Sequence, residues 1–170
     1  GKARRCDNGR NNHFNEAGYI WEKPEFPSAL LPAATCRELE FAARARGVCL
    51  RSEEQKAESG AGDLPDAYRW NPVDSTDEDV SNVFVWHPFL ECWRVVPYYG
   101  LLFGHAMAVP AHLREPRLLT AICREWVFLP SDIYVDDTVV TDLATGQGQA
   151  LDSAKEVFDI FGRPFDDAKD

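Results

Sequence analysis

The sequence has no long apolar run. Apolar stretches such as residues 101–103 and 106–110 are short and are separated by Gly104 and His105. Each is far shorter than the roughly 20 residues that cross a bilayer, so no membrane-spanning segment is expected. The opening residues also lack an initiator Met and the apolar core of a signal peptide, which indicates a piece of a longer product.

Cysteines at metal-binding spacing are also missing. The chain contains no CxxC pair and no histidine at zinc spacing, and its five cysteines stand far apart at positions 6, 36, 49, 92 and 123. We therefore expect free thiols in a reducing intracellular compartment, the cytoplasm or the nucleus.

Positive charge is scarce. Lys and Arg number 18 against 28 Asp and Glu, which gives a net charge of −10. This balance argues against a broad basic surface for nucleic acid, because neutralisation of phosphates by Lys and Arg dominates such binding. The charge is nevertheless segregated, with basic residues at 2–10 and 37–51 and acids at 74–79 and 166–170. The average therefore hides local basic segments.

The apolar content is sufficient for one core, since 45% of the 170 residues are hydrophobic and 12% aromatic. Helical spacing of apolar residues predicts helices over Cys36 to about Glu58, His105 to Trp126 and Ala150 to Phe161. Pro110 and Pro116 are expected to kink or split the second helix.

Runs of β-branched and aromatic residues predict two hairpins. One spans residues 80–97 with a turn at His87-Pro88, and the other spans residues 127–141 with a turn at 135–137. Residues 1–35, rich in Asn, Pro and Gly, are expected to form loops with short strands. The sequence thus predicts an α/β (α+β) fold in which an antiparallel sheet is backed by helices.

Two adjacent carboxylates, Asp136 and Asp137, occupy the tip of the second hairpin. Neighbouring acids repel each other and add nothing to a core, so a divalent cation is one reason to hold them there. The alternative is that Asp favours turns and that both side chains are solvated.

A third acid, Asp63, stands 73 residues before Asp136. It begins a short element that would bring its carboxylate to the same point if the element pairs beside the hairpin. Carboxylates that hold two Mg²⁺ (or Mn²⁺) ions about 4 Å apart are what two-metal phosphoryl transfer requires.

The order D-x-x-D-A-Y at 63–68, L-x-F-G at 101–104 and Y-V-D-D at 134–137 resembles palm motifs A, B and C of reverse transcriptases from retroelements and retroviruses. Residues 2–12 look like the fingers segment that contacts the triphosphate, and residues 158–169 look like motif D. The resemblance covers nearly the whole chain. It implies a partial fingers segment at 1–60 and a polymerase palm at 61–170, with the thumb absent.

By this resemblance, three acids would be the catalytic, metal-binding carboxylates, with the backbone carbonyl of Leu64 as an extra ligand: Asp63, Asp136 and Asp137. Tyr68 would be the steric gate that excludes a ribonucleotide 2′-hydroxyl. The other nucleotide-binding positions implied are Lys2, Arg4, Arg10, Asp66, Ala67, Gly104 and Lys169, the last being the motif D lysine.

The implied function is that of an RNA-directed DNA polymerase, which adds dNTPs to a primer strand on an RNA or DNA template. Further polyprotein domains, a thumb and an RNase H among them, would be its partners in the parent product. Motif B departs from the family pattern, with Leu102 where Pro is usual. An inactive retroelement remnant with weak nucleic-acid binding is therefore an alternative. An RNA-dependent RNA polymerase is a further one, against which Tyr68 argues.

Overall fold

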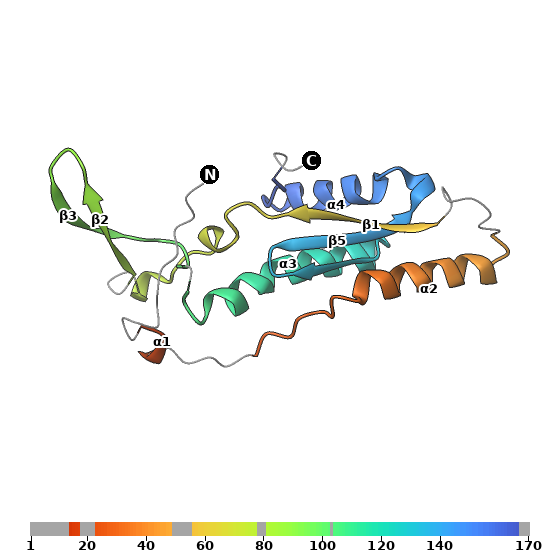
Figure 1. Ribbon diagram of the computed structural model, residues 1–170, viewed down its shortest axis with the longest axis horizontal. Coiled ribbons are helices and arrows are strands. Elements are labelled where there is room, and N and C mark those ends of the chain that lie inside the picture. The colour runs from red at the N-terminus through yellow and green to blue at the C-terminus, as the bar shows by residue number, and fades with distance from the viewer. Residues whose placement is uncertain (1–13, 18–22, 49–55, 78–80, 103, 167–170) are drawn as a thin grey trace. The chain divides into compact units, whose positions relative to one another are not determined.

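The computed structural model describes residues 14–17, 23–48, 56–77, 81–102 and 104–166. The chain divides into two compact units. We call Gly1–Pro24 with Asp66–His112 the hairpin unit, and Glu25–Pro65 with Leu113–Asp170 the sheet unit. Both units mix helices with antiparallel strands, which confirms the predicted α+β class (Figure 1). The assignment of 1–60 to fingers and 61–170 to palm stays a prediction.

The sheet unit is built on three antiparallel strands in the order β1-β5-β4. They are β1 (Ala57–Asp63), β5 (Asp137–Leu143) and β4 (Ser131–Tyr134). The register pairs Asp63 with Asp137, and Asp137 in turn with Tyr134. Side chains alternate between the two faces of a sheet, so these three residues share one face. The other face carries the buried Thr138 and Ile133.

Helices cover both faces of this sheet. Figure 1 shows it between α4 (Gln149–Ile160) and α2 (Leu31–Ala45), which both contact β1 and β5. On the α4 side, Gly60 leaves room for Leu151. On the α2 side, the Cys36 thiol lies 3.4 Å from the Ser59 hydroxyl. The buried core of the sheet unit includes Val140 of β5 and Ala154 and Phe158 of α4.

The third long helix, α3 (Ala108–Trp126), belongs to the sheet unit from Leu113 onward. Of the two predicted outcomes, a kink or a split, the split is wrong, because α3 runs as one helix through Pro116; the kink stays a prediction. Pro110 stands in the first turn, where an amide hydrogen would have no acceptor within the helix and its loss costs little. Leu113, Leu119 and Cys123 are buried, so packing compensates for the backbone bond that Pro116 cannot make.

The predicted boundaries of the first long helix were wrong. It begins at Leu31, with Pro32 in its first turn, and ends at Ala45. Gly47 follows with φ +81°, a conformation that ends helices readily. Glu58 to Gly62, expected to end that helix, instead belong to β1. The strand was missed because Ala, Ser and Gly have low β propensity.

The last helix and the second hairpin agree with the sequence prediction. The observed α4 differs from the predicted Ala150 to Phe161 by one residue at each end, and Gly162 follows with φ +73°. The β4–β5 hairpin begins at Ser131 rather than residue 127, and only Val135 and Asp136 form its turn. Asp137 is already paired in β5, which places one acid in the turn and one in the sheet.

The hairpin unit contains β2 (Asn82–His87) paired with β3 (Cys92–Pro97), as predicted. Short 3₁₀ helices, η2 (Ala67–Trp70) and η3 (Ser75–Asp77), precede it. The single-turn α1 (Phe14–Ala17) is attached through Asn15, whose side chain donates to the Gly104 carbonyl at 2.9 Å. Within the described part of residues 1–35 we find helical turns but none of the expected short strands.

Three of the cysteines, Cys36, Cys92 and Cys123, are free thiols; Cys6 and Cys49 lie outside the described residues. Burial raises the pKa of the Cys123 thiol, which suits a packing role within α3 rather than a reactive one. Among the described helices, none is both long and apolar enough to cross a membrane.

Candidate metal centre

Three carboxylates meet where β1 ends and β5 begins. Asp63 is the last residue of β1 and pairs directly with Asp137, the first residue of β5, while Asp136 precedes it in the turn. One oxygen from each side chain lies within 4.8 Å of the other two. The meeting of these acids was predicted, although Asp63 ends a strand rather than beginning an element. We call Asp63, Asp136 and Asp137 the acidic triad.

Backbone hydrogen bonds fix the triad from both sides. The Leu64 amide donates to the Asp136 carbonyl at 3.0 Å, and the Asp166 amide donates to the Asp63 carbonyl at 2.9 Å. The first bond continues the β1–β5 pairing past Asp63 and ties β1 to the turn. Leu64 is also 3% exposed, so its side chain anchors this end of β1 in the core. The role of its carbonyl as a metal ligand stays a prediction.

The geometry of the triad suits a divalent cation. Asp63 and Asp136 are half-buried and Asp137 is exposed. Oxygen ligands stand about 2.0–2.6 Å from Mg²⁺ or Ca²⁺, so two ligands on one ion lie up to roughly 5 Å apart, which covers the observed spread. Carboxylates held this close repel each other without a cation between them. The acidic triad is therefore close enough to hold a metal ion.

A small pocket of about 180 Å³ opens beside the triad. Asp63 and Asp137 line it together with Lys155 of α4 and with Phe165 and Asp166, which follow α4. Nothing in the local sequence marked Lys155 or Asp166 as neighbours of the triad. Their position depends on how α4 lies on the sheet, which only the folded structure shows.

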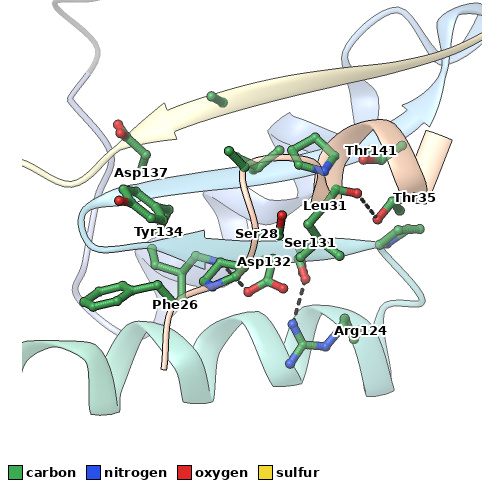
Figure 2. A pocket seen from close by; sticks show the side chains of 17 residues that line it. Phe26, Ser28, Leu31, Thr35, Arg124, Ser131, Asp132, Tyr134, Asp137 and Thr141 are labelled. Carbon is green, nitrogen blue, oxygen red and sulfur yellow. Dashed lines mark hydrogen bonds between the residues drawn. The ribbon is translucent and has the colours of Figure 1, made fainter. Parts of the chain in front are cut away.

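A larger pocket of about 880 Å³ lies on the face of the sheet that carries Tyr134 and Asp137 (Figure 2). Its lining is mainly apolar, and the Phe26 ring stands 5.7 Å from the ring of Tyr134. At its polar end the Arg124 guanidinium donates to the Ser131 carbonyl at 2.7 Å (Figure 2). The sequence offered no sign of this hollow, because segments 26–35 and 130–141 form it jointly.

Four predicted nucleotide-binding residues, Asp66, Ala67, Tyr68 and Gly104, belong to the hairpin unit. Asp66 is exposed at φ +51°, and its carboxylate accepts from the Arg69 guanidinium at 3.0 Å. Ala67 and Tyr68 are buried in η2. The Tyr68 ring packs edge-on against the ring of His112 at 5.3 Å. Gly104 is exposed at φ +87°, which suits a glycine.

The remaining predicted contacts lie outside the described residues. These are the basic positions assigned to the triphosphate and to motif D: Lys2, Arg4, Arg10 and Lys169. Their assigned roles stay predictions.

No protein-family model matches the chain, and no curated protein matches it. The described residues form an α+β fold with small antiparallel sheets, and an acidic triad lies where β1 ends and β5 begins.

Proposed function

We propose that this chain is the fingers–palm core of an RNA-directed DNA polymerase. The observation that carries the proposal is the meeting of Asp63 with Asp136 and Asp137 across paired strands. Acids 73 residues apart in the chain come together in the order of the palm motifs that the sequence resembles. A solvated turn would explain two adjacent acids, but it would not explain the third.

In this proposal, Asp63, Asp136 and Asp137 hold two Mg²⁺ (or Mn²⁺) ions. Such ions, when bound, activate a primer 3′-hydroxyl and stabilise the pyrophosphate leaving group. The protein's contribution is to fix the carboxylates before the reaction, through the β1–β5 register and the Leu64 and Asp166 amide bonds. The backbone carbonyl of Leu64 serves as a further ligand.

The proposal assigns substrate contacts to both ends of the chain and to η2. Tyr68 excludes a ribose 2′-hydroxyl, which favours DNA as the product. Asp66 and Ala67 hold the triphosphate pocket, and Gly104 lets the main chain approach the nucleotide. Lys2, Arg4 and Arg10 are the candidates for contact with the triphosphate, and which of them makes it stays open. Lys169 assists the departure of pyrophosphate. Template, primer strand and dNTP are the partners.

Primer extension tests this function. We expect Asp136→Asn to lower the rate of single-nucleotide addition about 1,000-fold, because loss of a metal-binding carboxylate removes several kcal/mol of transition-state stabilisation.

The matched control is Asp132→Asn, which removes the same charge from the neighbouring β4. Asp132 lies outside the triad, and its carboxylate accepts the Ile133 amide at 2.7 Å. We expect this variant to retain activity within about threefold, because the side-chain oxygen of asparagine can still accept the Ile133 amide. Equal rates in the wild type and Asp136→Asn would refute the polymerase assignment.

An inactive retroelement remnant is the second candidate, favoured by Leu102 in place of the usual motif B proline. The two candidates differ in metal binding. Calorimetric titration of the wild-type chain with Mn²⁺ in the presence of a dNTP separates them, because a remnant that has lost its site gives no binding heat above that of Asp136→Asn.

A further inference from the structure

Lys155 is the basic residue of the small pocket beside the triad. The charged residues that line the pocket are Asp63, Asp137, Asp166 and Lys155, three acidic residues and one basic residue. A sphere of 180 Å³ is only about 7 Å across. Over such distances charges near a protein surface still interact appreciably, at an effective dielectric constant of about 20.

The packing of α4 explains why Lys155 reaches this pocket. Leu151 and Lys155 are four residues apart and so lie on the same side of the helix, one turn from each other. Leu151 lies over Gly60, where an added Cβ would stand 3.3 Å from its Cδ2 atom. One helical turn covers about 5.4 Å and two strand residues about 6.7 Å. Lys155 therefore comes to lie near Gly62 at the end of β1, where the small pocket that it lines is also lined by Asp63 and Asp137.

The position of α4 is fixed independently of any charge. Ala154 and Phe158 are fully buried, and the Phe158 ring packs against Phe165 at 4.8 Å. Phe165 in turn occupies the space that a side chain at Gly62 would need. Lys155 is half-buried beside Ala154, so its stem is held by the same contacts.

We propose that Lys155 is the resident counter-cation of the acidic triad. It offsets part of the repulsion between the carboxylates while no divalent ion is bound, and it competes with an incoming ion for the same oxygens. The first half of this inference stands on the metal-free geometry alone. The second half rests on the proposed function, because it requires the triad to bind metal.

A double-mutant cycle tests the first half through thermal unfolding of the metal-free chain in EDTA. We expect Lys155→Met, which keeps the apolar stem, to lower Tm by a few degrees, and Asp63→Asn to recover at least half of that loss in the double variant. Lys56→Met is the matched control. It removes the same charge at the other end of β1, about 23 Å away for seven strand residues, and we expect no coupling with Asp63→Asn.

Titration with Mn²⁺ alone tests the second half. We expect Lys155→Met to bind Mn²⁺ about three- to tenfold more tightly than the wild type, because a competing charge is gone. Lys155→Arg and Lys56→Met should bind within about twofold of the wild type. Unchanged or weaker binding by Lys155→Met would overturn the competition, and would instead be the result for a residue that only supports the fold.

The two experiments fail separately. Additive effects of Lys155→Met and Asp63→Asn on Tm would overturn the counter-cation role, regardless of the result of the Mn²⁺ titration. Non-additive effects of the two substitutions on Tm, with no Mn²⁺ binding by any variant, would support the counter-cation role. That result would refute both the competition with metal and the proposed polymerase function.

Discussion

Val135 adopts φ +60°, a backbone conformation that a β-branched residue rarely takes. It occupies the first position of the two-residue turn between Tyr134 and Asp137. Turns of this length with a positive φ at the first position usually contain Gly there. The sequence has instead kept a valine beside Asp136, and strain of this kind concentrates where a site needs a rigid geometry.

Val135→Gly should therefore stabilise the sheet unit. Relief of a strained φ is worth about 1–3 kcal/mol, and the added freedom of Gly in the unfolded chain costs about 0.5–1 kcal/mol. We expect a net gain of about 1 kcal/mol in the free energy of unfolding by urea. Val139→Gly, in the middle of β5, is the control and should destabilise; a loss of stability in Val135→Gly would show that the turn is unstrained.

Glycines at the end of β1 determine how closely the next elements approach. A Cβ at Gly62 would stand 2.5 Å from a ring carbon of Phe165, which is 7% exposed and packs against the ring of Phe158. The segment 163–166 is also attached through Arg163, 5% exposed, whose guanidinium pairs with Glu115 of α3 at 3.2 Å. Burial lowers the pKa of Arg163, and the Glu115 charge opposes that effect. The segment that bonds to Asp63 is thus held on two sides.

Gly62→Ala should destabilise the protein by about 1–3 kcal/mol, the usual cost of forcing an extra carbon into a packed site. Gly60→Ala is the matched control, because its Cβ would meet only the flexible end of Leu151 at 3.3 Å, and we expect a change below about 1 kcal/mol. Chemical denaturation followed by tryptophan fluorescence measures both.

Replacement of Phe165 by Leu should restore part of the stability of Gly62→Ala by making room for the added carbon. Equal losses in Gly62→Ala and Gly60→Ala, or no recovery with Phe165→Leu, would show that the ring does not limit this position.

The sequence predicted those elements whose residue types or apolar spacing are typical of one kind of secondary structure. The β2–β3 hairpin and α4 were located within one or two residues, because β-branched and aromatic residues are concentrated in the hairpin and apolar residues recur by helical turns in α4. It did not predict β1, whose Ala, Ser and Gly residues resemble a loop. Those small residues are explained by Leu151 and Phe165, which approach from elsewhere in the chain.

The candidate site was likewise predicted only in part. Asp63, Asp136 and Asp137 could be found because their types and order carry a motif. Lys155 could not, since a lysine in an amphipathic helix is normally a solvated residue. Its neighbours are set by the packing of Phe158 and Leu151, which is a property of the folded chain.

In the proposed polymerase, the acidic balance of the whole chain limits how tightly it can hold a nucleic acid. A net charge of −10 leaves few cations to neutralise phosphates, so binding is weak, and added salt weakens it further because each phosphate contact releases counterions. We expect the 170-residue chain alone to release its primer after one or a few additions. Extension products resolved on a gel should shorten further between about 50 and 200 mM salt. Long products from this chain alone would contradict that expectation.

Because Asp63 pairs directly with Asp137, the position of the acidic triad depends on the register of β1 and β5 as well as on the identity of its residues. A one-residue slip of a strand turns its side chains to the opposite face. An in-frame deletion of one codon inside β1 would therefore either force a bulge in β5 or move Asp63 out of register with Asp137. Every letter of the three motifs would survive such a deletion. A gene copy could thus read as intact and encode a protein in which the acids no longer meet.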